Sequence, residues 1–235
     1  MRTIMLLNSK GGCGKSTLAT NLAAYYANQN KPVALADFDP QGSSMEWLAA
    51  RPEGRPPIHG IAGWREVVRP PRQTEYLILD VPAGCHGSQL TNLVRRAQTL
   101  IIPVLPSPTD IRAAARFIHE LLLVGRVERK ETRLAVIANR VRENGFWQNK
   151  MEQTLGAVNV PYATVHTHMY RNLERFLLRL KIPFVATLRD SPNYQLADEQ
   201  GLGIFELGAR AAYDAEQWQP LVRWLDSRRS VPAAA

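Results

Sequence analysis

A glycine-rich segment with two lysines occupies residues 8–17, which read NSKGGCGKST. It follows an apolar run at residues 3–7 and opens a stretch with helical spacing. Glycines let backbone N–H groups turn inward around an anion, and the first turn of a helix directs its positive dipole end at the same point. The segment therefore predicts a phosphate-binding loop between a strand and a helix.

Two side chains of this loop suit nucleotide chemistry. Lys15 can supply a positive charge to the β- and γ-phosphates, and the Ser16 hydroxyl can coordinate Mg²⁺. The strict pattern G-x-x-x-x-G-K-[ST] fails at Ser9, which stands where the first glycine is expected. A second lysine, Lys10, directly precedes the glycines.

Acidic residues follow two later apolar runs. Asp80 ends the run YLILD at residues 76–80, where a carboxylate can hold a magnesium-bound water. Asp39 follows the run at residues 33–37, and a carboxylate there can orient an attacking water and hold a magnesium-bound water. Asp37 has two open alternatives, a contact to magnesium-bound water or a loop cap. The predicted metal site comprises Ser16, Asp39 and Asp80, with the carboxylates acting through water.

Short apolar runs alternate with longer segments of helical spacing along the chain. Strands are predicted at residues 3–7, 33–37, 76–80, 99–104, 134–139, 162–165 and 184–188, and helices at residues 15–28, 89–97 and 111–124. Several runs are apolar throughout, which is typical of parallel strands covered on both faces. The pattern predicts a doubly wound, mostly parallel α/β sheet with helices on both faces.

Proline and glycine punctuate this pattern without dividing it. Residues 51–57 (RPEGRPP) and 69–72 (RPPR) are predicted loops. Residues 1–226 are predicted to form a single domain, and residues 227–235 a flexible tail. Residues 151–162 and 173–184 read as two similar helix-then-strand units, as consecutive units of such a fold often do.

Composition narrows the class of protein. The 235 residues are 45% hydrophobic, which excludes a fully disordered chain, and no apolar run reaches the roughly 18–20 residues that cross a bilayer. Two cysteines cannot build a disulfide framework, so a cytoplasmic protein is expected. The 29 Lys+Arg against 21 Asp+Glu give a net charge of +8, which favours a polyanionic partner or is simply a solvated surface.

The motifs together resemble those of a known family. KGGCGKST at residues 10–17 resembles the deviant Walker A box of the ParA/MinD family of P-loop ATPases. ADFDPQG at residues 36–42 resembles its switch I, LILDVPAG at 77–84 its Walker B strand and switch II, and IPVLPSPTDI at 102–111 follows in the same order. RDSPNY at 189–194 and GLGIFEL at 201–207 match less specifically. The resemblance implies the P-loop NTPase fold of the deviant Walker A type.

The resemblance also implies roles for individual residues. It implies ATP and Mg²⁺ as cofactors, slow ATP hydrolysis and an ATP-bound homodimer in which Lys10 reaches the nucleotide of the partner subunit. Lys10, Lys15 and Asp39 are then the catalytic residues, and Asn139 with Arg140 is expected to contact adenine. The expected phosphate contacts are Lys10, Gly11, Gly12, Cys13, Gly14, Lys15, Ser16 and Thr17.

The basic residues of the second half are candidate contacts for DNA. ParA-type relatives carry DNA-binding arginines in this half, and Arg189 lies at a comparable loop. Arg171, Arg175 and Arg179 are spaced by four, so a helix would stack them on one face beside Lys181. Because the Walker box begins at residue 10, no N-terminal helix-turn-helix domain is expected, and binding to double-stranded DNA should be nonspecific and salt-sensitive. The alternative is a solvated helix face.

The resulting expectation is a dimerising ATPase associated with the nucleoid. It would position or segregate a plasmid, a chromosome or a protein organelle such as a carboxysome, with a ParB-like or cargo-adaptor protein that stimulates hydrolysis. One alternative is a MinD-like membrane regulator, because Trp218, Leu221, Val222 and Leu225 form an apolar stripe, although such a stripe is more often packed on a core. Another is a P-loop metabolic enzyme of the cobyrinic acid diamide synthase or nitrogenase reductase-like group.

Overall fold

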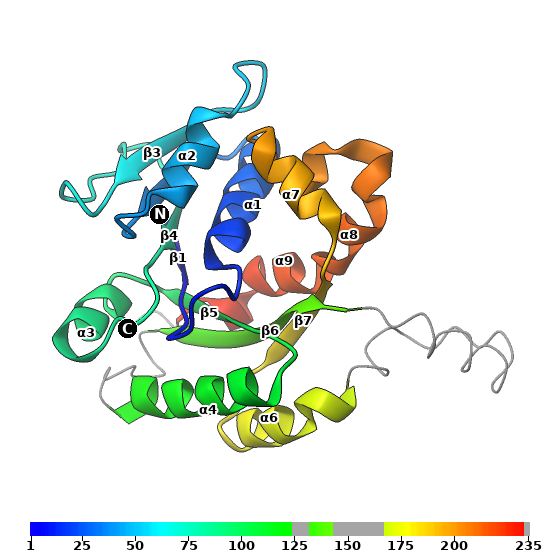
Figure 1. Ribbon diagram of the computed structural model, residues 1–235. Helices are drawn as coiled ribbons and strands as arrows, with labels where there is room; N and C mark the ends of the chain where they lie inside the picture. Colours follow the sequence, from blue (N-terminus) through cyan, green and yellow to red (C-terminus); the bar gives the residue numbers. More distant parts are fainter. Residues whose placement is uncertain (124–131, 143–166, 233–235) are drawn as a thin grey trace, which may run out of the picture.

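Seven parallel strands make up one sheet in the computed structural model, which describes residues 1–123, 132–142 and 167–232 (Figure 1). The strands are β1 (Arg2–Leu6), β2 (Val33–Asp37), β3 (Ile58–Ala62), β4 (Tyr76–Asp80), β5 (Thr99–Val104), β6 (Arg133–Val141) and β7 (Phe184–Arg189). Their order across the sheet is β3-β2-β4-β1-β5-β6-β7. All carboxyl ends therefore lie at one end of the sheet, with β1 in the middle.

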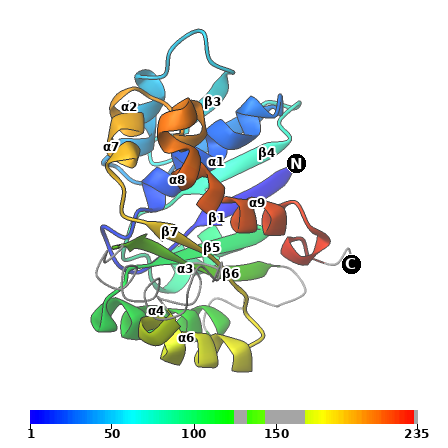
Figure 2. The same ribbon diagram turned by 90° about the vertical axis from the view of Figure 1, so that its right-hand side faces the viewer.

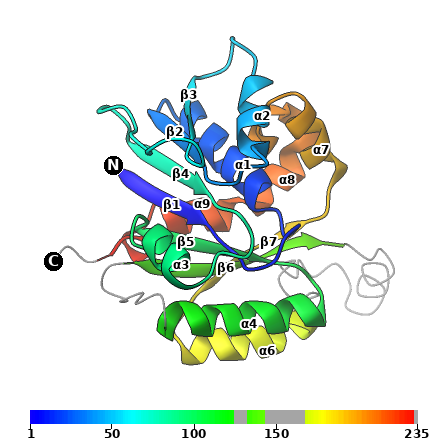
Figure 3. The same cartoon turned by 60° about the vertical axis from the view of Figure 1, so that its left-hand side comes forward.

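Helices cover both faces of this sheet. One face carries α1 (Lys15–Asn28), α2 (Ser43–Ala49), α7 (Pro192–Glu199), α8 (Ala212–Gln217) and α9 (Gln219–Leu225). The other carries α3 (Gly87–Val94), α4 (Pro108–Leu123) and α6 (Thr167–Arg179), as the turned view in Figure 2 shows. Figure 3 shows α4 and α6 side by side beneath β5 and β6. The predicted doubly wound α/β fold is confirmed.

The central strand explains why the predicted strands are apolar throughout. Ile4 and Leu6 of β1 pack in the hydrophobic cluster that contains α1, whereas Met5 and Leu7 pack in the cluster that contains α3 and α4. All four side chains are fully buried. Because successive residues of a strand point to opposite faces, a strand covered on both sides is apolar at most of its positions.

Most predicted elements occur with ends shifted by a few residues, and α1, β2, β4 and β5 have the predicted bounds. The edge strand β3 was not predicted, because its sequence IHGIA has neither strict alternation nor a continuous apolar run. Its pairing with β2 stabilises it instead. The predicted loops at 51–57 and 69–72 contain neither helix nor strand. The strand predicted at 162–165 and the unit at 151–162 lie outside the described residues.

Ser230, in the predicted C-terminal tail, contacts the rest of the fold. Ser230 is fully buried, and its hydroxyl donates a hydrogen bond to the Leu225 carbonyl at 2.6 Å. The Ser230 carbonyl accepts hydrogen bonds from Thr99 Oγ1 at 2.6 Å and from Arg2 Nη2 at 2.8 Å. Ser230 thus packs against the rest of the fold, and the boundary of the domain at residue 226 stays a prediction.

The apolar stripe near the C-terminus is part of the core. Trp218, Leu221, Val222 and Leu225 are all at most 3% exposed. The Trp218 indole also donates a hydrogen bond to the Tyr194 hydroxyl at 2.9 Å. This confirms the interpretation of the stripe as a packed helix face. Among the helices that can be described, none combines the length and the apolar character needed to cross a membrane.

Candidate nucleotide-binding site

The glycine-rich loop connects the central strand β1 to α1. Gly12 and Gly14 have φ values of +71° and +88°, in the left-handed region that favours glycine. Gly14 is the N-cap of α1, and no side chain caps this helix end. The N–H groups of the first turn are therefore left for an anion, and the helix dipole favours negative charge there. The structure places this loop where the sequence predicts it.

Lys15 is the cation of this loop. It is 8% exposed, and its Nζ donates a hydrogen bond to the Lys10 carbonyl at 3.3 Å. The same carbonyl accepts from the Cys13 thiol at 3.3 Å, and burial raises the pKa of that thiol. Cys13 is therefore a buried thiol that contacts the loop backbone. The Lys10 side chain is half-buried and makes no ion pair with any described residue.

Asn139, predicted to contact adenine, supports the loop in this structure. It is 6% exposed, and its Nδ2 donates a hydrogen bond to the Cys13 carbonyl at 2.8 Å. A Cβ at Gly14 would lie 2.3 Å from this nitrogen, so the contact also requires glycine there. Arg140 has a φ of +53° and forms an exposed ion pair with Asp190 at 3.1 Å. The adenine role of both residues stays a prediction.

Asp37 and Asp80 are neighbours in the register of β2 and β4. Asp37 is fully buried, and its carboxylate accepts hydrogen bonds from the Asp39 N–H at 2.9 Å and from the Ser44 N–H at 3.1 Å. Burial raises the pKa of Asp37, although these backbone hydrogen bonds oppose the rise. These hydrogen bonds are those of a loop cap, and the contact of Asp37 to magnesium-bound water stays a prediction. Asp39 is half-buried and accepts a hydrogen bond from the Gln41 N–H at 3.0 Å.

Asp80 lies at the end of β4 beside the loop. It is 1% exposed, and burial raises its pKa to about 6, while hydrogen bonds with the Ser16 and Ser44 side chains work in the opposite direction. Ser44 Oγ donates to Asp80 Oδ2 at 2.7 Å. The phosphate loop and the segment after β2 therefore meet at this one carboxylate.

Oxygen donors of this kind are the ligands that magnesium prefers. Ser16 contributes a hydroxyl and Asp80 a buried carboxylate, and they hydrogen-bond each other. Ionising the neighbouring carboxylates of Asp37 and Asp80 inside the protein is unfavourable, and a divalent cation would offset that cost. The residues present thus fit a magnesium ion at the phosphate end of the loop.

Ser44 is the member of this site that the sequence reasoning missed. Ser44 follows the segment 36–42 by two residues, and no feature of the sequence distinguishes it from its neighbour Ser43. In the structure Ser44 is fully buried whereas Ser43 is exposed. Its backbone bond to Asp37 and its hydroxyl bond to Asp80 tie the start of α2 to both strands.

Replacing Ser44 by alanine is expected to lower the free energy of unfolding by about 1.5–3 kcal/mol, because the buried Asp80 carboxylate loses a hydrogen-bond donor. Urea denaturation followed by circular dichroism measures the change. Ser43→Ala is the matched control and should stay within about 0.5 kcal/mol of the unchanged protein. Equal effects of the two substitutions would contradict a supporting role of Ser44.

Arg189, predicted to contact DNA, is engaged inside the protein. Its Nε forms an ion pair with the fully buried Asp214, and its guanidinium lies 4.7 Å from the centre of the Tyr213 ring. Burial raises the pKa of Asp214, but hydrogen bonds from Arg189, Asn193 and Ser191 outweigh it and lower that pKa. The structure therefore adds a structural role for Arg189, and its DNA contact stays a prediction.

The other basic residues predicted to bind DNA lie on and after α6. Arg175, Arg179 and Lys181 are exposed, while Leu173 and Leu177 of the same helix are buried. The helix thus packs through Leu173 and Leu177 and presents Arg175 and Arg179 to solvent. The side chain of Arg171 lies outside the described part.

Fold and site together define a P-loop nucleotide-binding protein. A family model described as the CobQ/CobB/MinD/ParA nucleotide binding domain matches residues 4–202. The chain therefore belongs to the ParA/MinD family, as its motifs predict.

Individual relatives extend the comparison to the whole chain. The maintenance of carboxysome distribution protein A of Halothiobacillus neapolitanus is 25% identical over 222 residues, which cover 92% of each chain. Among solved structures, the ATP complex of a Cyanothece McdA variant is similar with a TM-score of 0.69 and 16% identity, over 94% of this chain and 96% of that chain. The MinD cell division protein of Aquifex aeolicus is similar with a TM-score of 0.65 and 18% identity, over 100% of each chain. These two structures establish the shared fold.

Proposed function

We propose that this protein is an ATPase that positions a protein cargo inside the cell, of the type that distributes carboxysomes. The observation that carries the proposal is the similarity over 92% of both chains to a protein named for carboxysome distribution. The nucleotide site supports it, since a positioning cycle needs a molecule whose state changes when ATP is hydrolysed. Segregation of a plasmid or a chromosome by the same cycle of ATP binding and hydrolysis is the alternative function.

The residues of the site suit distinct tasks in that cycle. Lys15 and the N–H groups at the start of α1 bind the phosphates, and Asp80 with Ser16 holds Mg²⁺, which neutralises phosphate charge when bound. Asp39 orients the attacking water. Lys10 has a side chain without an acidic partner among the described residues, which suits a cation that reaches the nucleotide of a partner subunit.

ATP-dependent dimerisation would control binding to DNA. A dimer presents twice the basic surface of a single subunit to DNA, and the exposed arginines of α6 are the best candidates for phosphate contacts. Release of cargo then follows hydrolysis, stimulated by a ParB-like or adaptor protein. The burial of the stripe around Trp218 supports DNA rather than a membrane surface as the partner.

The test is binding to a random-sequence DNA duplex with ATP, with ADP and without nucleotide, across a salt series. Tight binding with ATP alone, weakening as salt rises, is the expected result. Arg175→Glu/Arg179→Glu should lower the affinity roughly tenfold or more at low salt and flatten the salt dependence. Arg65→Glu/Arg69→Glu, which changes the net charge equally on another element, should retain most of the binding. Absence of binding in every nucleotide state would refute the nucleoid mechanism.

A further inference from the structure

The strand β3 is a free edge of the sheet. Within the described residues it pairs with β2 alone. Proteins commonly protect an exposed edge with lysine, proline or a bulge, but the strand sequence IHGIA contains no such residue. The Ile61 and Ala62 carbonyls already accept hydrogen bonds from the loop that follows the strand. The remaining outward backbone N–H and C=O groups of β3 can pair with an added strand.

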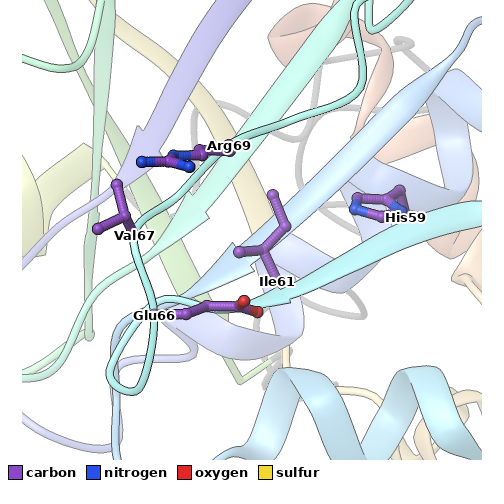
Figure 4. Close-up of a pocket in the computed structure, with 5 residues that line it drawn as sticks. All are labelled: His59, Ile61, Glu66, Val67 and Arg69. Atoms are coloured by element: carbon purple, nitrogen blue, oxygen red, sulfur yellow. The ribbon is translucent and has the colours of Figure 1, made fainter.

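A pocket lies beside this edge (Figure 4). It has a volume of about 350 Å³ and is lined by His59, Ile61, Glu66, Val67 and Arg69. His59 and Ile61 are two residues apart on β3 and so project from the same face of the strand. Val67 is 68% exposed, which makes it one of the most exposed large apolar side chains described. Alternate side chains of an added strand would lie on the same face as Ile61, next to this pocket.

The charge around β3 favours an acidic occupant. Four arginines of the loops that flank β3 are exposed and make no ion pair with any described residue. Only two glutamates of these loops, Glu53 and Glu66, are likewise exposed and make no ion pair with a described residue. The arginines are Arg55, Arg65, Arg69 and Arg72. The excess of positive charge would attract acidic side chains and repel basic ones.

The loop after β3 also touches the segment that carries Asp39. A Cβ built on Gly42 would lie 3.4 Å from the Trp64 ring, so the indole packs against the Gly42 backbone. A Cβ on Gly63 would lie 3.1 Å from the Asp37 carbonyl and 3.2 Å from the Phe38 ring. The loop after β3 therefore contacts the chain on both sides of Asp39.

We propose that the free edge of β3 and its pocket bind an extended, acidic segment of the stimulating partner protein by strand addition, and that Trp64 passes this binding on to the segment around Asp39. This inference rests on the proposed ATPase function for the stimulated step, whereas the binding step is independent of it. Duplex DNA would also meet the arginines, but Ile61, Val67 and the acidic Glu66 in the pocket suit a peptide better than a phosphate backbone.

The first experiment measures peptide binding to the full chain by fluorescence anisotropy. The probe is a labelled octapeptide of alternating glutamate and valine, and an alternating lysine–valine octapeptide is the control. We expect saturable binding of the acidic peptide alone, weakened roughly tenfold or more by Arg65→Glu/Arg69→Glu at low salt. The matched control variant Arg175→Glu/Arg179→Glu should bind the acidic peptide with an affinity within about twofold of that of the unchanged protein. No saturation, or equal affinity of both double variants, would overturn the proposal.

Further measurements show where the peptide binds and separate peptide binding from DNA binding and from ATP hydrolysis. Amide hydrogen exchange should slow at residues 58–62 on peptide binding, and protection confined to other segments would overturn strand addition. A loss of duplex DNA binding in Arg65→Glu/Arg69→Glu, with peptide binding unchanged, would assign these arginines to DNA and would also overturn the proposed peptide site.

Phosphate release is assayed in parallel with and without peptide. A protein that binds the peptide at β3 but never hydrolyses ATP would refute the proposed function and leave the docking site standing.

The coupling is tested with Trp64→Ala. This variant should bind the acidic peptide with nearly unchanged affinity, because Trp64 is not among the pocket-lining residues. It should lose the peptide-dependent increase in phosphate release while keeping its basal rate. Stimulation that survives in Trp64→Ala would overturn the coupling through Gly42.

Discussion

Replacing Lys15 by alanine is expected to weaken ATP binding by roughly 100-fold or more, because a buried cation that faces a polyanion is removed from a site shielded from water. Lys15 is 8% exposed, so water cannot replace its charge effectively. Titration with a fluorescent ATP analogue measures the loss. Its backbone contact to Lys10 is a long hydrogen bond of 3.3 Å, so the fold should survive the substitution.

Lys10→Ala is the matched control for this experiment. It removes a lysine five residues earlier on the same loop, yet its side chain is half-buried and is proposed to serve the partner subunit. ATP affinity should largely persist in this variant, while ATP-dependent dimers disappear in light scattering. Unchanged ATP affinity in Lys15→Ala would contradict the assignment of the loop.

Replacing Asp39 by alanine is expected to retain ATP binding and to slow phosphate release by roughly 100-fold or more, since positioned acid–base groups contribute factors of that size. Within the described residues, the Asp39 side chain accepts one hydrogen bond, from the Gln41 N–H. Its removal should therefore leave the sheet and α2 intact. ATP then persists in the site, and the protein should accumulate in its DNA-bound state.

Phosphate release and retention on duplex DNA are measured together for this variant. Glu46→Ala removes an exposed carboxylate from the same region, on α2, and should hydrolyse ATP at the unchanged rate. Rapid hydrolysis by Asp39→Ala would refute a catalytic role for this aspartate. Slow hydrolysis without retention on DNA would separate the chemical step from the DNA-binding step.

Hydrophobic patterning predicts most of this fold because parallel strands covered on both faces consist mainly of apolar residues. The runs that became β2, β4 and β5 have the predicted bounds for this reason. The edge strand β3 escapes prediction because one side of its backbone has no neighbour, and its sequence tolerates histidine and glycine. Its place in the sheet depends on β2, which is distant in sequence.

The phosphate site was predictable from the chain alone, because its chemistry is local. Gly12, Gly14, Lys15 and Ser16 are consecutive or nearly so, and they therefore lie close together in any turn that they form. Carboxylates at the ends of apolar runs were predictable in the same way, since parallel strands bring their carboxyl ends to one edge.

Only the tertiary structure decided what several polar side chains contact. Asp37 caps α2, Asn139 supports the phosphate loop across 126 residues, and Arg189 at the end of β7 pairs with Asp214 on α8. Ser44 differs from its neighbour Ser43 through burial alone. The sequence by itself determined the sheet, the glycine-rich loop and the family, because these follow from local pattern and backbone freedom. The partners of buried polar groups depend on which distant segments meet, and that is set by the packing of the whole chain.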